Sequence, residues 1–288
     1  MRSKHDTWDI NSGVGVTAVW VAAARAAETA RPDARIHDPY AEQLVKAADL
    51  PTRILDALGE DGAHTEVLRH YLTVRTRFFD DFFLHATERG TPQAVLLGSG
   101  LDTRPYRLAM PARTWELDQP TVIGFKNSVL AAASAEARSD HTALGIDLRR
   151  DWPDALVRAG FSPRCPTAWL AEGLLPYLPA DSQRHLLTAV DDLSGPGSAA
   201  CVEVFTRPTA DSLDDPRLDR LRKELGISLT VDDLFYDEPG IDCAAWFRAH
   251  GWTVSEANPA EVATDLDLTL PEEGGLFDRP AFVTATKD

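Results

Sequence analysis

The pattern of hydrophobic and polar positions along the chain changes near residue 90. Before that point it predicts helices at residues 16–29, 40–48 and 66–88, with charged residues or proline near their ends. After Gly90, Thr91 and Pro92, short apolar runs alternate with helical segments. Such alternation is typical of a mostly parallel sheet with helices on both faces.

The apolar runs after residue 90 predict the strands of this sheet. They span residues 94–97, 114–117, 142–146, 167–171, 199–205, 252–256 and 282–286. Helical or loop segments at residues 120–137, 152–159 and 181–193 lie between the first five strands.

A charged segment at residues 207–250 interrupts the alternation between the fifth and sixth strands. Ligands of open α/β sheets bind near the carboxyl ends of the strands, so we expect this insertion to form a substrate lid. We therefore expect a single domain with four parts. They are a helical cap (1–90), a cofactor-binding core (91–206), the lid insertion (207–250) and a final strand pair (251–288).

One face of the predicted helix 66–88 is apolar apart from a single arginine. Its members, at helical spacing, are Leu68, Leu72, Arg75, Phe79 and Phe82. A buried guanidinium needs an anionic partner, so Arg75 meets either a structural carboxylate or the carboxylate of a ligand. Arg77 lies on the opposite face, where we expect it to be solvated and paired with Asp81.

The first predicted strand ends abruptly in the turn Gly98-Ser99-Gly100. Glycines allow a backbone to approach a ligand closely, and a turn of this kind after a buried strand receives nucleotide-like ligands in α/β proteins. Because two glycines are a common pair, the weight of this signal depends on the residues at the ends of the neighbouring strands.

Acidic residues stand at the ends of the next three strands. Asp118 comes twenty residues after Gly98, the offset at which an acid accepts hydrogen bonds from a ribose diol. Asp147 is suited to an adenine amino group with Leu148 packed on the ring, and Glu172 stands beside the same crevice. Each acid alone could be a helix cap or a solvated strand end. Together, after a glycine turn, they favour one shared nucleoside site.

The identity of this nucleoside ligand depends on a missing glycine. A dinucleotide fold needs a third glycine for close packing of helix and strand, and here that position is Thr103. S-adenosylmethionine has no phosphates, and the carboxylate of its methionine would find a cation in Arg75. We therefore expect S-adenosylmethionine as the cofactor. A nicotinamide-dependent reductase is the alternative from another class of enzyme.

Composition narrows the possible partners. The 288 residues include 29 Lys and Arg against 45 Asp and Glu, and the net charge of −16 argues against a general nucleic-acid surface. No apolar run reaches about 18 residues, so we expect no membrane span. Three widely spaced cysteines and a polar start without a signal peptide favour the cytoplasm. The eight histidines show no metal-ligand spacing, so no metal is expected.

The run LGSGLDTRPYRL at residues 97–108 resembles the signature of the leucine carboxyl methyltransferase-like family, in its actinobacterial S-adenosylmethionine-dependent branch. Four further stretches agree with that family. They are HDPYA at 37–41, VRTRFFD at 74–80, ELDQP at 116–120 and AEGLLPYL at 171–178. The matching stretches run in family order, whereas the C-terminal third matches loosely.

The resemblance implies a class I methyltransferase fold, with a Rossmann-like seven-stranded sheet of order 3-2-1-4-5-7-6, an antiparallel strand 7, and N-terminal helices that close over the cofactor. It assigns cofactor contacts to Arg75, Gly98, Ser99, Gly100, Asp118, Asp147, Leu148 and Glu172. Among these, Arg75 would bind the methionine carboxylate and Glu172 would lie near the methionine amino group.

The methyl acceptor is expected to be a carboxylate of a small metabolite or peptide, because a carboxylate is already ionised and needs no general base. A hydroxyl group of a natural product is the alternative. The candidate acceptor-binding residues are Phe205, Arg207, Tyr236 and Trp246, although core packing is the commoner role for the aromatic ones. The pattern singles out no catalytic residue and does not determine the oligomeric state.

Overall fold

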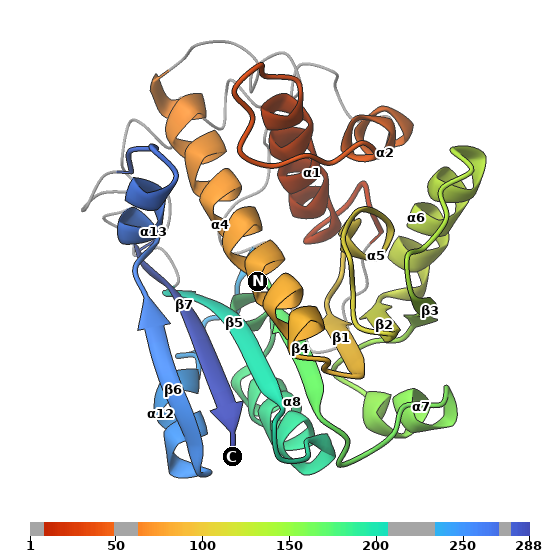
Figure 1. The fold of residues 1–288 in the computed structure, drawn as a ribbon, viewed down its shortest axis with the longest axis vertical. Coiled ribbons are helices and arrows are strands. Elements are labelled where there is room, and N and C mark those ends of the chain that lie inside the picture. The colour runs from red at the N-terminus through yellow and green to blue at the C-terminus, as the bar shows by residue number, and fades with distance from the viewer. Residues whose placement is uncertain (1–8, 49–62, 207–233, 271–277) are drawn as a thin grey trace.

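The computed structural model describes residues 9–48, 63–206, 234–270 and 278–288. At its centre is a seven-stranded sheet with the strand order β3-β2-β1-β4-β5-β7-β6 (Figure 1). The strands are β1 Gln93–Leu97, β2 Arg113–Asp118, β3 Asp140–Gly145, β4 Thr167–Ala171, β5 Ala199–Thr206, β6 Trp252–Ala257 and β7 Asp278–Lys287.

The helices surround this sheet. They are α1 Gly15–Thr29, α2 Ala41–Ala47, α4 Ala63–Glu88, α5 Arg104–Arg107, α6 Pro120–Ala132, α7 Trp152–Arg158, α8 Ala180–Leu193, α12 Cys243–Ala249 and α13 Pro259–Asp265, with a short 3-10 turn η1 at Leu175–Tyr177. No helix in the described part of the chain is long and apolar enough to cross a membrane.

Strands β1 to β5 pair in parallel, whereas β7 runs antiparallel to both β5 and β6. The predicted fold, strand order and reversed last strand are therefore confirmed. The parallel register sets Leu97 opposite Leu117, so the carboxyl ends of β1 and β2 lie at the same edge of the sheet. This edge brings together the turn after β1 and the acids at the ends of β2, β3 and β4.

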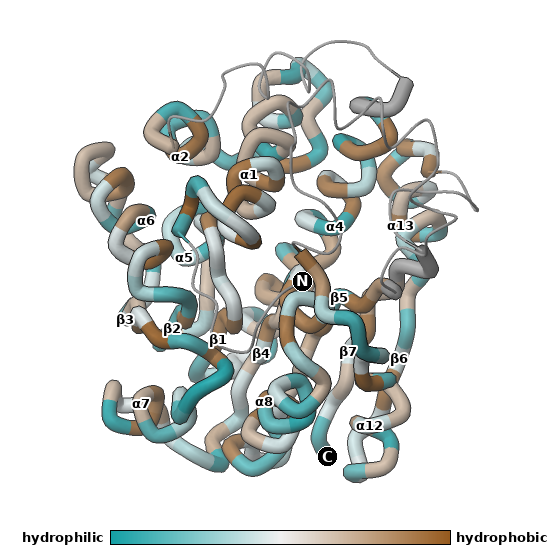
Figure 2. The backbone as a smooth tube through the Cα atoms, turned by 180° about the vertical axis from the view of Figure 1, so that it is seen from behind, coloured by the Kyte–Doolittle hydropathy of each residue, from teal (hydrophilic) through white to brown (hydrophobic). Residues whose placement is uncertain are grey.

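Successive residues of the central strand β1 belong to two different hydrophobic clusters, one on each face of the sheet. Ala94 and Leu96 of β1 pack with Phe79 of α4, whereas Val95 and Leu97 pack in the cluster that contains residues of α7, α8 and α12. The period of two along a strand sends successive side chains to opposite faces. Figure 2 shows that α7, α8 and α12 each combine hydrophilic and hydrophobic positions, as helices with one buried face do.

A third cluster joins the N-terminal helices to the glycine turn. Val19 of α1, Leu44 of α2 and Leu72 of α4 pack together with Leu101, the residue directly after the turn. Burial of a leucine-sized side chain contributes roughly 1.5–3 kcal/mol. These helices are therefore anchored directly over the residues after β1.

Several element boundaries differ from those predicted. Helix α6 ends at Ala132, not at residue 137, because Ser134 adopts a left-handed φ of 52°, which a continuing helix does not allow. Helices α5 and α13 are too short to produce a clear period and were not predicted. Residues 207–233 of the predicted lid lie outside the described residues. Residues 243–249 of the predicted lid form α12, which packs in the core with β6 and β7.

Candidate functional site

The turn after β1 is held in place by the end of β2. The backbone N–H groups of Gly98 and Ser99 donate to the carbonyl oxygen of Leu117 at 2.9 and 3.1 Å. Gly98 and Gly100 have φ values of 65° and 47°, in the left-handed region that favours glycine. A Cβ on Gly98 would lie 2.7 Å from Leu174 Cδ1, so a larger residue there would displace the Leu174 side chain.

A buried lysine supports the same turn from α6. The Lys126 side chain is fully buried, and its Nζ donates to Ser99 Oγ and to the carbonyl oxygen of Asp102, both at 3.2 Å. The charge of Lys126 is balanced by an ion pair with buried Glu116, which also lies 3.1 Å from His141 Nε2. Since both ends of the turn bind the same ammonium group, Lys126 restricts the turn to one shape.

Asp118 is at the tip of β2, where the sequence predicts it, and it contacts the glycine turn. Its Oδ2 accepts the backbone N–H of Gly100 at 2.6 Å, and its Oδ1 accepts that of Gln119 at 2.6 Å. Burial raises the pKa of Asp118, although these two N–H groups act in the opposite direction. A carboxylate oxygen has more than one lone pair, so both oxygens keep capacity to accept further hydrogen bonds.

Asp147 comes shortly after β3 and is paired within its own loop. Arg149 Nη2 lies 2.7 Å from Asp147 Oδ2, and Arg149 Nη1 donates to the Tyr236 hydroxyl at 3.4 Å. Burial acts to raise the pKa of Asp147, but the guanidinium of Arg149 outweighs it and lowers the pKa. The side chain of Leu148 packs in the core with Leu117. Tyr236, a predicted acceptor contact, thus belongs to the Asp147 end of the site.

Arg75 of α4 lies between two carboxylates that come from neighbouring strands. Its Nη1 donates to Glu203 Oε2 at 3.1 Å, and its Nε lies 2.9 Å from Glu172 Oε1 without the alignment of a hydrogen bond. Tyr71, one helical turn before Arg75, donates its hydroxyl to Glu203 Oε1 at 2.6 Å. Among the residues that the structure describes, no acceptor is bonded to Arg75 Nη2.

The sequence left two roles open for Arg75, and the structure contains a structural carboxylate pair. Burial acts to lower the pKa of Arg75, but Glu203 and Glu172 raise it above its ordinary value, so the guanidinium stays charged. Burial also raises the pKa of Glu203, and Arg75 opposes that shift. The ligand role remains available through Nη2, because an arginine carries five donors in a planar fork.

Further charges continue this cluster toward α5. Arg104 Nη1 contacts Glu172 Oε2 at 2.6 Å, and Arg104 Nε contacts Asp80 Oδ1 at 2.6 Å. Asp80 also receives both terminal nitrogens of Arg107, at 2.6 and 2.7 Å. Asp102, directly after the turn, pairs with Arg104 as well. A continuous chain of ion pairs therefore connects the end of β4 with α4 and α5.

An aromatic cluster lies beside this edge of the sheet. Phe205, near the end of β5, contacts Phe235 edge-on with ring centres 6.1 Å apart, and Tyr177 stacks on Phe235 at 5.2 Å. Phe205 and Tyr177 lie at the carboxyl ends of β5 and β4, the edge at which open α/β sheets bind their ligands. The role of Phe205 in acceptor binding stays a prediction.

The other two predicted acceptor residues have different outcomes. Trp246 is on α12, where its ring stacks on that of His250 at 3.7 Å, just before the amino end of β6. Because β6 runs in the same direction as β1 to β5, Trp246 lies at the edge opposite the glycine turn, and the structure does not bring it together with the other site residues. Arg207 lies outside the described residues.

Three residues of the site were missed by the sequence analysis. Glu203 interrupts an apolar strand, and Lys126 interrupts an apolar stretch of α6. A charge within an apolar run is the signal that singled out Arg75, and it applies equally to both. Arg104 carries no such signal, because it comes after a turn in which an exposed arginine would be unremarkable.

Comparisons with known proteins agree on the nature of this chain. The family model described as leucine carboxyl methyltransferase matches residues 18–191. A protein from Saccharopolyspora erythraea, assigned by name as an S-adenosyl-L-methionine-dependent methyltransferase, is 46% identical over 289 residues that cover 99% of this chain and 100% of its own. A protein of the same assignment from Mycobacteroides abscessus is 44% identical over 278 residues, which cover 94% and 90%.

Two solved structures share the fold. A DUF574 family protein from Streptomyces avermitilis has a TM-score of 0.54 at 14% identity, with 93% of this chain and 97% of that chain covered. A protein from Thermobifida fusca, assigned by name as a methyltransferase, has a TM-score of 0.53 at 18% identity, with 94% of each chain covered. At these identities the likeness concerns the fold alone.

Proposed function

Because the chain belongs to the leucine carboxyl methyltransferase family and is an S-adenosyl-L-methionine-dependent methyltransferase of class I fold, we propose that it converts a carboxylate of a small metabolite or peptide into a methyl ester. One observation carries this proposal. In the described part of the chain, the acids beside Arg75, namely Glu172 and Glu203, are both paired with it, so neither is free to remove a proton. An ionised carboxylate is the acceptor that needs no such base.

The residues at the carboxyl edge fit the cofactor. S-adenosylmethionine supplies a methyl group on a positively charged sulfur that also carries an amino-acid tail and a nucleoside. We propose that Arg75 binds the tail carboxylate through Nη2 and that Glu172 accepts the tail amino group. Gly98, Ser99 and Gly100 allow the backbone to lie against the tail.

The nucleoside half of the cofactor fits the next two strand ends. We propose that Asp118 binds the ribose diol and that Asp147 and Leu148 bind the adenine. Support comes from the acceptor capacity left on Asp118 and from the single edge at which β1, β2 and β3 end. Since the side chain of Leu148 is in the core, its backbone is the part that we expect to meet the base.

The protein contributes positioning and exclusion of water to the transfer. Methyl transfer needs the nucleophile in line with the bond that breaks, and a held geometry removes the entropy of that alignment. The rings of Tyr177, Phe205 and Phe235 offer an apolar wall on which an acceptor carboxylate would lose part of its hydration. The wall is formed at the ends of β4 and β5, beside Glu172.

Labelled methyl transfer separates the two acceptor classes. The full chain is incubated with methyl-labelled cofactor and a pool of metabolites and short peptides, and the product is treated with mild alkali. A methyl ester releases labelled methanol, as we expect, whereas a methyl ether keeps its label. Retention of the label through alkali would replace the carboxylate by a hydroxyl acceptor and leave the methyltransferase assignment intact.

We also propose that the protein works in the cytoplasm on small-molecule or peptide substrates, without nucleic-acid or membrane partners. The three cysteines, Cys165, Cys201 and Cys243, are free thiols, as expected in a reducing compartment. Fractionation of the native host, with the protein detected by antibody, tests the location.

A further inference from the structure

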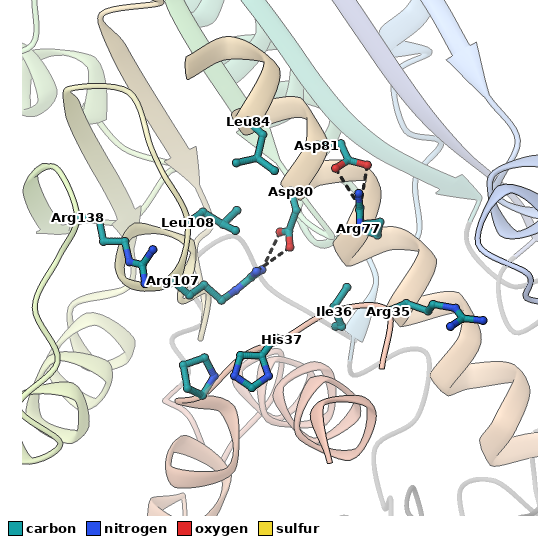
Figure 3. A pocket seen from close by; sticks show the side chains of 11 residues that line it. Arg35, Ile36, His37, Arg77, Asp80, Asp81, Leu84, Arg107, Leu108 and Arg138 are labelled. Carbon is teal, nitrogen blue, oxygen red and sulfur yellow. Dashed lines mark hydrogen bonds and ion pairs between the residues drawn. The ribbon is translucent and has the colours of Figure 1, made fainter. Parts of the chain in front are cut away.

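A cavity lies outside the cofactor edge. It has a volume of about 310 Å³ and is lined by residues of α4, α5 and the segment 35–39, and by Leu108 and Arg138 (Figure 3). Pockets that bind small molecules begin at about this size, roughly 300 Å³. The cavity therefore has room for one compact molecule.

The lining of the cavity is cationic although the chain as a whole is strongly acidic. Four arginines line it, against two aspartates. Both aspartates are already paired, Asp81 with Arg77 and Asp80 with Arg104 and Arg107. Arg35 also has a carboxylate partner outside the lining, Asp267, at 4.0 Å. The unpaired positive charge of the lining therefore belongs to Arg138.

One cation on the lining has no acceptor among the described residues. It is not Arg107, whose two terminal nitrogens bind Asp80 and whose Nε is buried out of reach of the cavity. Arg138 is anchored by its backbone N–H to the Pro105 carbonyl oxygen at 2.8 Å, while its guanidinium makes no bond or ion pair with the described residues.

Apolar side chains also line the cavity. They are Ile36, Leu84 and Leu108, which Figure 3 shows together with Arg107 and Arg138. We propose that this cavity binds a small organic anion, with its oxyanion group held by Arg138 and its apolar body against Ile36, Leu84 and Leu108. An inorganic anion would pair with Arg138 but would leave the apolar residues of the lining without a contact.

Calorimetry on the full chain with benzoate as the probe tests the proposal, with uncharged benzamide as the matched ligand. We expect benzoate to bind at one site and benzamide to bind at least about tenfold more weakly, since a charge-assisted pair is lost. Equal binding of the two ligands would overturn the proposal.

The variant Arg138→Glu tests the location of this site. Arg138 is exposed and has no side-chain partner among the described residues, so we expect the variant to fold, with an unchanged melting temperature, and to lose benzoate binding by about tenfold or more. The control Arg184→Glu makes the same charge change on exposed Arg184 of α8, on the other face of the sheet, and should bind benzoate normally.

Saturation with S-adenosylhomocysteine separates the cavity from the cofactor edge. We expect benzoate to bind the saturated protein as it binds the free protein. Loss of benzoate binding upon saturation, or equal losses in the two glutamate variants, would mean that benzoate occupies the cofactor edge or binds through general charge, and the proposal would fail.

Discussion

Gly100 donates its backbone N–H to Asp118 Oδ2 at 2.6 Å, so the acid expected to bind ribose also holds the glycine turn. Gly100 follows β1 and Asp118 ends β2, which pairs with β1 in parallel. Removal of the whole carboxylate would therefore disturb the turn as well as the ligand contact. A variant that keeps an acceptor oxygen is needed to separate these effects.

For this reason we predict different outcomes for two substitutions of Asp118. Asp118→Ala leaves the Gly100 N–H without an acceptor and should lower the free energy of unfolding by about 1–3 kcal/mol. Asp118→Asn keeps one acceptor oxygen and should fold nearly as wild type, yet bind S-adenosylhomocysteine at least about tenfold more weakly. Urea unfolding and calorimetry measure the two quantities. Wild-type affinity in the asparagine variant would show that the ribose lies elsewhere.

The variant Arg75→Lys tests whether cofactor affinity depends on the planar guanidinium of Arg75 or only on its positive charge. Lysine keeps a positive charge between Glu172 and Glu203 but has no planar fork with a free Nη2 for a ligand carboxylate. We expect a loss of cofactor affinity of about tenfold or more, measured by calorimetry. The control is Arg77→Lys, two residues along on the exposed face of α4, where cofactor affinity should not change. Equal affinities in both variants would exclude Arg75 from the cofactor site.

Lys126→Met is predicted to weaken both the fold and the cofactor site. The substitution leaves Glu116 buried without its ammonium partner, a loss of about 3–5 kcal/mol in comparable buried pairs. It also removes the two bonds that restrict the turn at Ser99 and Asp102. We expect a lower urea midpoint and weaker binding of S-adenosylhomocysteine at a temperature where the variant is folded. A folded variant with unchanged affinity would assign Lys126 to stability alone.

Asp102 is predicted to make the protein sensitive to acid. Burial acts to raise its pKa, but Arg104, Arg107 and Arg25 hold it at about 2, below the ordinary value of 3.8. The stabilisation is therefore fully present above about pH 4 and is lost as pH falls toward 2.

Urea unfolding across this range checks the prediction for Asp102. The variant Asp102→Asn should be less stable than wild type near neutral pH, because it removes the charge beside three arginines, and it should depend less on pH below about 4. An identical pH dependence in both proteins would assign the acid sensitivity to other carboxylates.

Much of this molecule is determined by local patterns in the sequence. The periods of two and 3.6 located the strands and the long helices, because each element buries one face or both. The same logic singled out Arg75, a charge within the apolar face of α4, and placed Arg77 in solvent with Asp81, at 2.9 Å in the structure. The strand order came from the resemblance to a family, because the hydrophobic periodicity of a strand does not indicate which strand it pairs with.

The tertiary structure alone decided which charges meet. Glu203 is 128 residues from Arg75 along the chain, and the two come together because α4 packs across the sheet beside β5. In the same way Lys126 reaches Ser99, and Arg107 and Arg138 reach one cavity, only after α5 and α6 have docked. A charged residue within an apolar run is visible in the sequence. Which residue it pairs with depends on long-range packing. The chain by itself therefore determined the fold class and the methyl donor, and folding decided how the charges around that donor are paired.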